Sequence, residues 1–270
     1  MTAPFQLNQL TLSALDPRDL PWYRQRPAYE ETSSLLYPLI RQAGFERMLD
    51  IGANYGLVGM LAARQGLQVL CVEADPRLIP AIERHFADNG LSCVALVNAI
   101  AGAAADAGTT FSLNPTSTLD NRVDMPQWEK LPVPTMAMAT LIAQHGFDRG
   151  PLFIKIDTQG FEERVIAGLM PYLERRGDWA IKMEFAPAWL VSQRTDPLAL
   201  LHALIERFEV VEFPERITWG TPSFDALFSR SIPAAEAEAF VAYVRNLNSA
   251  DRGWVDLLVR PRRADGIVGR

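Results

Sequence analysis

Short apolar runs alternate along this chain with amphipathic helical patterns, and that alternation limits the possible folds more than any other feature. Five nearly continuous apolar runs have the length of a strand: residues 47–51, 68–72, 93–97, 152–156 and 179–183. Strands that are apolar throughout are buried on both faces, as in parallel sheets whose crossover helices cover both sides. The alternation therefore predicts an α/β fold with a parallel sheet between two layers of helices.

The rest of the chain extends this pattern without a linker that would divide it. Helical patterns follow at 197–208 and 236–247, and strand patterns at 210–213 and 255–260. We expect one large domain over residues 46–270, with a loop-rich insert near 214–233. Residues 1–45 are expected to form a cap: an irregular arm over 1–28, followed by a helix from Tyr29 to Ala43.

Two local patterns add detail to the large domain. Asp75-Pro76 predicts the start of a helix, because Asp is a favoured N-cap and Pro is favoured at the first helical position. Residues 101–135 are rich in Ala, Gly, Thr, Asn and Pro and have only a weak pattern, which predicts no particular element.

Composition excludes several classes of function. The formal net charge of −6 disfavours a nucleic-acid partner, since proteins that bind phosphate backbones are usually basic. Two cysteines are too few for a disulfide scaffold, and the three histidines match no zinc spacing. The N-terminus lacks a signal-peptide pattern, and no apolar stretch reaches the roughly 18 residues of a membrane span. We expect a cytoplasmic protein with no membrane partner, and the sequence leaves a homo-oligomer open.

Polar residues that directly follow the expected strands are the candidates for function. The right-handed crossover rule places the carboxyl ends of parallel strands at one edge of the sheet, and ligands bind in the crevice there. These candidates are the loop Asp50–Gly56, Glu73, Asn98, Asp157 and Glu184.

The loop Asp50-x-Gly52-x-Asn54-x-Gly56 allows three interpretations of the cofactor. A dinucleotide site requires G-x-G-x-x-G, but Asn54 and Leu57 occupy the second and third glycine positions counted from Gly52. A phosphate-binding P-loop requires G-K-[ST], which occurs nowhere in the chain. The third interpretation is S-adenosyl-L-methionine. A simpler reading is that the glycines only make a strand-to-helix turn.

The acidic residues around this loop favour a nucleoside with a positively charged group. Asp50 stands at the strand end beside a helix N-terminus, where a carboxylate repels phosphate but suits an ammonium and a sulfonium. Glu73 lies 21 residues after Gly52, where an acidic residue can accept both ribose hydroxyls. NAD sites share this second feature. Glu73 therefore indicates a cofactor that contains adenosine, but it does not distinguish S-adenosyl-L-methionine from NAD.

Three motifs, LDIGANYG, VEADP and FIKIDTQGFEERVIAG, resemble the FkbM-type family of S-adenosylmethionine-dependent methyltransferases over roughly residues 46–186. The resemblance implies a Rossmann-like class I methyltransferase fold with a seven-stranded, mostly parallel sheet. Many members carry Glu where Gln159 stands, and Leu-Asp where Thr140-Leu141 stands. Because residues 1–45 and 187–270 match loosely, we expect these flanks to shape the acceptor pocket.

The resemblance also implies a set of cofactor-binding residues. The methionine and ribose side would be lined by Asp50, Gly52, Asn54 and Gly56, with Glu73 holding the ribose. Asn98 and Ala99 would border the adenine. Transfer of the methyl group from S-adenosyl-L-methionine would leave S-adenosyl-L-homocysteine as the product.

Side chains at the later strand ends are candidates for the chemistry. Alternation places Lys155 and Asp157 on one face of their strand, and Lys182 and Glu184 on one face of the next. Lys155 either pairs with a nearby carboxylate or borders the reacting centre with Asp157 and Glu184. Asp157 is the first candidate for the general base, and Glu184 is the second. An alternative role for Asp157 is to accept a hydrogen bond from the cofactor's amino group.

A metal and a lid are two further hypotheses. Asp157 and Glu184 could contribute to a divalent metal site, but no third ligand is evident, so a metal is not expected. Aromatic residues outside the strands form either a lid or platform for the acceptor, or small satellite cores: Trp22, Tyr23, Trp219 and Phe224.

The sequence thus predicts an S-adenosyl-L-methionine-dependent methyltransferase. The resemblance indicates O-methylation of a small molecule, a sugar or glycan, or a natural-product intermediate. Two alternatives remain at this point: a nicotinamide-dependent oxidoreductase, and a non-catalytic binding module that keeps the same fold.

Overall fold

The computed structural model describes most of the chain, in the ranges 1–7, 9–21, 27–105, 109–214, 217–218, 220–248 and 251–262, with the side chains of 27–34 left out. The statements below concern these residues.

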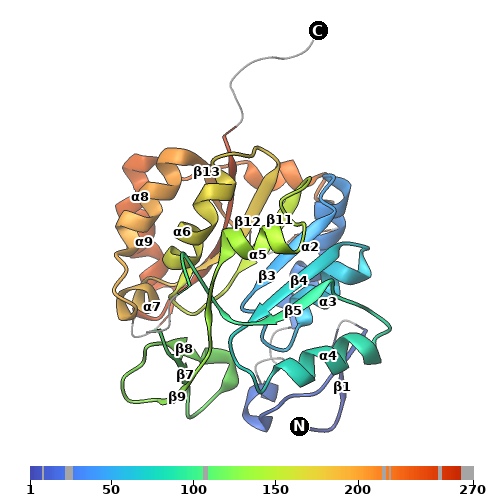
Figure 1. Ribbon diagram of the computed structural model, residues 1–270. Helices are drawn as coiled ribbons and strands as arrows, with labels where there is room; N and C mark the ends of the chain where they lie inside the picture. Colours follow the sequence, from blue (N-terminus) through green and yellow to red (C-terminus); the bar gives the residue numbers. More distant parts are fainter. Residues whose placement is uncertain are drawn as a thin grey trace.

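Seven strands form the central sheet, in the spatial order β13–β14–β12–β11–β3–β4–β5 (Figure 1). In chain order their bounds are β3 Arg47–Ile51, β4 Gln68–Glu73, β5 Ala95–Asn98, β11 Leu152–Ile156, β12 Trp179–Phe185, β13 Phe208–Glu212 and β14 Val255–Pro261. Strands β5, β4, β3, β11 and β12 pair in parallel. Strand β14 runs antiparallel to both β12 and β13. This topology confirms the expected Rossmann-like class I methyltransferase fold.

Helices cover both faces of the sheet. One face packs against α2 Pro27–Gln42, α3 Leu57–Arg64, α4 Ile79–Asp88 and the 3-10 helix η3 Phe224–Phe228. The other packs against α5 Met138–Gln144, α6 Glu162–Leu173, α7 Pro187–Ser192, α8 Pro197–Arg207 and α9 Ala237–Asn246. Strand alternation separates the two cores: Leu49 and Ile51 of β3 face the second layer, and Met48 faces the first. In the described part of the chain, no helix has the length and apolar character that a membrane crossing requires.

Two regions in which no strands were predicted contain them. The stretch 101–135 holds a three-stranded antiparallel sheet, β8 Arg122–Val123, β7 Phe111–Leu113 and β9 Glu129–Leu131, with the 3-10 helix η2 Thr118–Asp120 between β7 and β8. It also contributes to a parallel pair, β6 Ile100–Gly102 with β10 Thr135–Ala137. The first residues form a hairpin, β1 Phe5–Leu7 and β2 Leu10–Leu12, followed by the 3-10 helix η1 Pro17–Asp19. The sequence did not predict strands in either region, because strands of only two or three residues leave no detectable periodicity.

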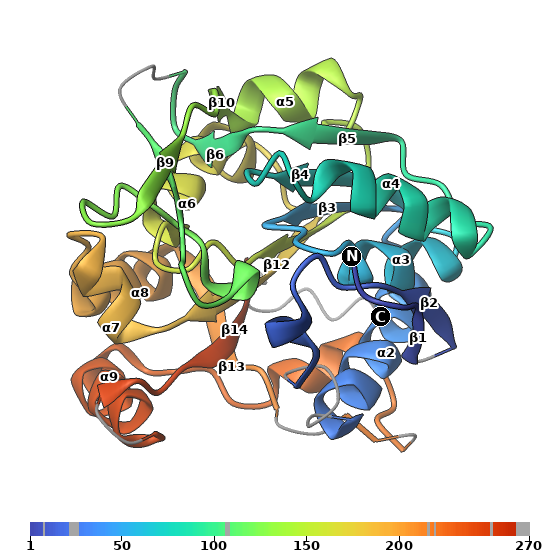
Figure 2. The ribbon, with the colours of Figure 1, turned by 90° about the horizontal axis from the view of Figure 1, so that it is seen from below.

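These two added regions lie at the same edge of the central sheet. Figure 1 shows the small sheet β8–β7–β9 and the N-terminal hairpin below the central sheet, and Figure 2 looks onto that edge from below. The parallel strands of the central sheet end at this edge. The small sheet and the N-terminal segment therefore close the crevice in which ligands of this fold class bind.

The expected helix start at Asp75-Pro76 was wrong. Helix α4 begins at Ile79, and the Asp75 carboxylate instead accepts a hydrogen bond from the Arg77 N–H at 2.9 Å. The Asp75 carbonyl accepts another from the Leu78 N–H at 3.0 Å. Asp75 therefore closes a turn after β4, because its side chain can bond the main chain two residues later.

Candidate active site

A cavity of about 470 Å³ lies at the carboxyl edge of the sheet, a size usual for small-molecule sites. The candidate residues that line it are Gly52, Asn54, Glu73, Ala99, Lys155, Asp157 and Glu184. Three further candidates, Asp50, Gly56 and Asn98, do not line it. The structure thus brings most of the candidates together around one space.

Gly52 is required by packing. It adopts φ +74°, and a Cβ atom there would lie 1.8 Å from the main-chain oxygen of Asp157. The loop after β3 therefore approaches the end of β11 more closely than any side chain would allow.

The main-chain N–H groups of the loop 52–56 all donate to acceptors within the protein. Those of Gly52 and Ala53 donate to the Val72 carbonyl, and that of Gly56 donates to the Ala53 carbonyl. The Tyr55 N–H donates to the Asn54 side chain, and the Asn54 N–H donates to Glu73. A pyrophosphate bound at a helix N-terminus needs such groups to be free. The loop 52–56 itself therefore offers a phosphate no free main-chain donor.

Glu73 ends β4 with its carboxylate at the cavity wall. Its Oε2 accepts a hydrogen bond from the Asn54 N–H at 2.6 Å, and its Oε1 accepts one from the Asp75 N–H at 2.7 Å. Burial raises the pKa of Glu73 to about 7, although these two hydrogen bonds oppose the shift. The carboxylate is held in one orientation by the main chain and keeps further lone pairs for ligand hydroxyls.

Asn98 and Ala99 have different surroundings. The Asn98 side-chain amide donates to the main-chain carbonyls of Glu73 at 2.9 Å and Ala74 at 3.0 Å. It thereby fixes the chain that follows β4. Ala99 lies at the cavity wall, and its N–H also donates to the Glu73 carbonyl.

Asp50 is fully buried, with Lys155 beside it. The Lys155 Nζ lies 3.4 Å from Asp50 Oδ1 and 3.6 Å from Asp157 Oδ2, and it donates to the Gly52 carbonyl at 2.6 Å. Burial raises the pKa of Asp50, and the Lys155 charge opposes that shift. Lys155 thus fits both earlier interpretations, because it pairs with carboxylates and also lines the cavity.

At the β12 end of the cavity, Asp157 and Glu184 lie on either side of Gln159. The Gln159 Nε2 donates to Asp157 Oδ1 at 2.8 Å and to Glu184 Oε2 at 3.3 Å. Burial, followed by the charge of Asp157, raises the pKa of Glu184 well above its usual value. A carboxylate with a raised pKa is a stronger base.

The same end holds a buried ion pair between Lys182 and Asp256, and both residues line the cavity. Sequence reasoning missed Asp256. It belongs to β14, and the antiparallel register places it opposite Glu184. The available signal was an acidic residue within the apolar run Val255–Val259, where a buried charge needs a partner.

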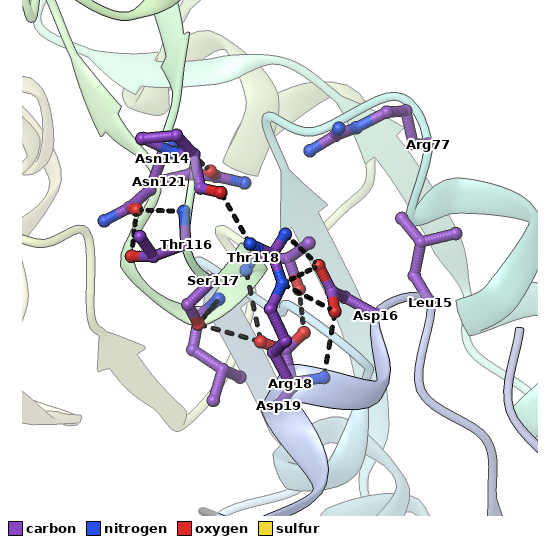
Figure 3. A network of polar contacts seen from close by, with 12 residues as sticks. Leu15, Asp16, Arg18, Asp19, Arg77, Asn114, Thr116, Ser117, Thr118 and Asn121 are labelled. Carbon is purple, nitrogen blue, oxygen red and sulfur yellow. Dashed lines mark hydrogen bonds and ion pairs between the residues drawn. The ribbon is translucent and has the colours of Figure 1, made fainter.

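A network at the cavity wall joins the N-terminal segment to the loop after β3. The Tyr55 hydroxyl donates to the buried Asp19 carboxylate at 2.7 Å and accepts from the Leu15 N–H at 2.9 Å. Asp19 also accepts from the Ser117 hydroxyl at 2.8 Å and from the Thr118 N–H at 3.2 Å (Figure 3). Sequence reasoning missed Asp19, Ser117 and Thr118 because each stands in a segment without a pattern.

Of the two alternatives for the aromatic residues, a lid and a packed core, Phe224 fits the packed core. That residue is 3% exposed and packs edge-on against Phe45 and Phe153 on one face of the sheet. The other three aromatic residues proposed for a lid lie outside the described residues: Trp22, Tyr23 and Trp219. The tryptophans that line the cavity are Trp189 and Trp254.

No three His, Cys, Asp or Glu side chains lie close enough to hold a metal ion within the described ranges. Asp157 and Glu184 therefore gain no third ligand of these types from the fold.

Comparison with known proteins finds one partial sequence match. No family model matches the chain. Over 104 residues it is 36% identical to the ubiquinone biosynthesis O-methyltransferase of Cereibacter sphaeroides, in three strains. The match covers 38% of this chain and 40% of the relative's length.

Solved structures with similar folds include several methyltransferases. The plantazolicin methyltransferase BamL, in complex with a desmethyl analogue and SAH, is 11% identical; the comparison covers 91% of this chain and 90% of BamL, with a TM-score of 0.46. SAH-bound PaMTH1 from Podospora anserina is 12% identical, with 93% and 91% coverage and a TM-score of 0.46. TomG from Streptomyces achromogenes, an O-methyltransferase in complex with SAM, is 10% identical, with 93% and 92% coverage and a TM-score of 0.39.

Proposed function

We propose that this protein is an S-adenosyl-L-methionine-dependent O-methyltransferase of the FkbM type that acts on a small molecule, a sugar or glycan, or a natural-product intermediate. One observation carries the choice of cofactor: the main-chain N–H groups of residues 52–56 donate within the protein, and the Glu73 carboxylate faces the cavity beside them. This arrangement suits a nucleoside without phosphates. It offers the pyrophosphate of a nicotinamide dinucleotide no free donor from this loop, so we do not favour the nicotinamide alternative.

The proposed binding mode divides the cavity into two ends. The cofactor end comprises Gly52, Asn54, Glu73 and Ala99, with Glu73 accepting the ribose hydroxyls and Ala99 beside the adenine. The acceptor end comprises Asp157, Gln159, Glu184, Lys182 and Asp256. Asp50, Gly56 and Asn98 support the cofactor end from behind its wall.

The N-terminal residues 1–45 serve in this proposal as a cap on a methyltransferase domain over residues 46–270. The cap reaches the site, since Arg18 and Tyr37 both line the cavity.

When bound, the cofactor supplies a methyl group on a sulfonium, which leaves as a thioether when the group is transferred. The chain's task is to align the acceptor oxygen with that methyl, and such positioning can supply about 7–11 kcal/mol of the barrier. The acceptor hydroxyl must also lose its proton. A carboxylate of the acceptor end, Asp157 or Glu184, takes that proton as a general base, worth about 10²–10⁴-fold in rate.

The preference for oxygen as the accepting atom has two supports. The motif resemblance indicates O-methylation, and the Cereibacter sphaeroides relative, matched over part of its length, is named as an O-methyltransferase.

Calorimetry with S-adenosylhomocysteine tests the proposal directly. The wild-type chain should bind one molecule saturably and should bind NAD far more weakly. Glu73→Ala should weaken binding about 100-fold, because two hydrogen bonds to a charged acceptor are each worth about 1.5 kcal/mol or more. Glu238→Ala, on the exposed side of α9, should bind like the wild type. Equal affinity of the wild type and Glu73→Ala would refute the assigned site, and absence of binding to the wild type would refute the cofactor.

The acceptor can then be sought in cell extracts. Incubation of extract with S-adenosylmethionine and the protein should produce a compound heavier by one methylene unit, detected by mass spectrometry. A product methylated on nitrogen or carbon would contradict the proposed acceptor atom.

A further inference from the structure

Gln159 bridges two carboxylates at the acceptor end. Its Nε2 lies 2.8 Å from Asp157 Oδ1 and 3.3 Å from Glu184 Oε2. A primary amide carries two hydrogens on this nitrogen, so it can donate one to each carboxylate. The pattern also sets the orientation of the amide, because its oxygen in the same place would face two acceptors.

The backbone of Gln159 adopts an unusual conformation where its side chain bridges the two carboxylates. Its φ is 58°, in the left-handed region, which costs free energy for a residue with a side chain. Its neighbours hold the turn: Glu162 accepts from the Thr158 N–H at 2.9 Å and from the Gly160 N–H at 3.2 Å. A Cβ on Gly160 would lie 2.5 Å from the Trp189 carbonyl. Packing against α7 therefore maintains the strained turn and directs the Gln159 side chain at the two carboxylates.

The charges around the pair explain why a bridge is needed. Glu184 is 7% exposed and faces the negative charges of Asp157, Glu162 and Asp256. The nearby cations are shared with other carboxylates: Lys155 contacts Asp50 as well as Asp157, and Lys182 pairs with Asp256. The Gln159 amide donates to Asp157 and Glu184 together, and it therefore opposes the repulsion between them.

The other end of the amide points to a ligand. The Gln159 Oε1 is buried and has no hydrogen-bond partner, which is unfavourable for a polar atom. Gln159 also lines the cavity. A donor on a bound molecule would satisfy this oxygen.

We propose that Gln159 is a positioning residue that fills the place of a divalent cation between Asp157 and Glu184. It thereby holds the Glu184 carboxylate where that carboxylate can take the proton of the substrate hydroxyl without a metal. A second hydroxyl of the acceptor donates to Gln159 Oε1. As the acceptor's O–H bond breaks and its proton passes to Glu184, an O–CH₃ bond forms and the C–S bond of the cofactor breaks, with the electron pair left on sulfur. The assignment of this proton rests on the proposed function; the bridge itself does not.

Manganese titration, followed by electron paramagnetic resonance, tests the bridge without an acceptor. Gln159→Glu supplies a third hard oxygen ligand and should bind one Mn²⁺ about tenfold or more tighter than the wild type. Adding Asp157→Asn should remove the gain. Gln144→Glu makes the same change on the exposed surface of α5 and should behave as the wild type. Equal Mn²⁺ affinity of the wild type and Gln159→Glu would overturn the proposal.

The pH dependence of the free energy of unfolding is a second test, because a purely structural role of Gln159 would not change it. In Gln159→Met the carboxylates lose both hydrogen bonds, so ionising them should become more costly. The ratio of the unfolding equilibrium constants of variant and wild type, from urea titrations, should rise about tenfold between pH 5 and pH 8. The same ratio at both pH values would show a packing role only and would overturn the proposal.

Calorimetry with S-adenosylhomocysteine separates this inference from the proposed function. Wild type that fails to bind would refute the proposed function, while the manganese and pH results would still decide on the bridge. Gln159→Met should bind S-adenosylhomocysteine within about threefold of the wild type, since its Oε1 serves the acceptor. A loss of about tenfold or more would place the orphaned oxygen at the cofactor instead and overturn its assignment.

Discussion

The two ends of the cavity hold their carboxylates in different ways. At the cofactor end, Glu73 is fixed by main-chain N–H groups of Asn54 and Asp75. At the acceptor end, Glu184 and Asp256 are held by side chains, those of Gln159 and Lys182. Main-chain donors keep their position through substitution of the side chain, whereas a side-chain partner can be replaced. Substitution of a partner side chain can therefore release a carboxylate at the acceptor end, whereas the main-chain donors that hold Glu73 remain.

The largest expected effect comes from breaking the ion pair of the acceptor end. Asp256→Leu leaves the buried Lys182 ammonium without its carboxylate and should lower the free energy of unfolding by about 3–5 kcal/mol, measured by urea titration.

The double variant Lys182→Met/Asp256→Leu is the control for this prediction. It removes both charges together, so most of the lost stability should return. A double variant as unstable as the single one would show that the site depends on packing rather than on paired charges.

The next effect concerns pH and the cofactor end. The pKa of Glu73 is about 7 in the folded protein, against the ordinary 4.5 of an unfolded chain. Its contribution to stability is therefore complete below pH 4.5 and is lost as the pH rises through 7. The shift corresponds to about 3 kcal/mol. Glu184, with its raised pKa, acts in the same direction.

Urea titrations between pH 4.5 and pH 8 would measure this loss. Glu73→Gln cannot ionise, so its stability should fall less steeply over this range than that of the wild type. Parallel profiles would mean that Glu73 ionises normally and that the acceptor end alone causes the pH dependence.

The smallest expected effect tests how the N-terminal segment supports the cofactor end. Tyr55→Phe removes the hydroxyl that joins Asp19 to the Leu15 N–H, and leaves buried polar groups unsatisfied. We expect a loss of about 2 kcal/mol in the free energy of unfolding. Tyr243→Phe removes an exposed hydroxyl that contacts Glu212 and should change stability by less than about 0.5 kcal/mol. Similar losses in both variants would contradict a specific role for the network.

Several elements were predictable because their signals are local. Strands β3 and β11 begin and end at the residues expected from their apolar runs. The glycine-containing loop after β3 was identified for the same reason. A strand buried on both faces reveals its length by its apolar residues alone.

Other parts of the site could not be predicted because their partners are distant in the chain. Asp19 meets Thr118 across 99 positions, and Lys182 meets Asp256 across 74. The sequence around one residue of such a pair gives no indication of its partner. Gln159 was noted only as a difference from the resembling family, and nothing in the sequence showed that its amide would lie between two carboxylates.

The sequence by itself determined the order of strands and helices, the glycine-containing turn and the acidic residue at the end of β4, because hydrophobic periodicity and turn chemistry act over a few residues. Only the tertiary structure decided which carboxylates would meet. The antiparallel insertion of β14 beside β12 places Asp256 next to Glu184, and the strained turn after β11 directs Gln159 between Asp157 and Glu184. Strand register and close packing set these positions, and neither is encoded in any single segment.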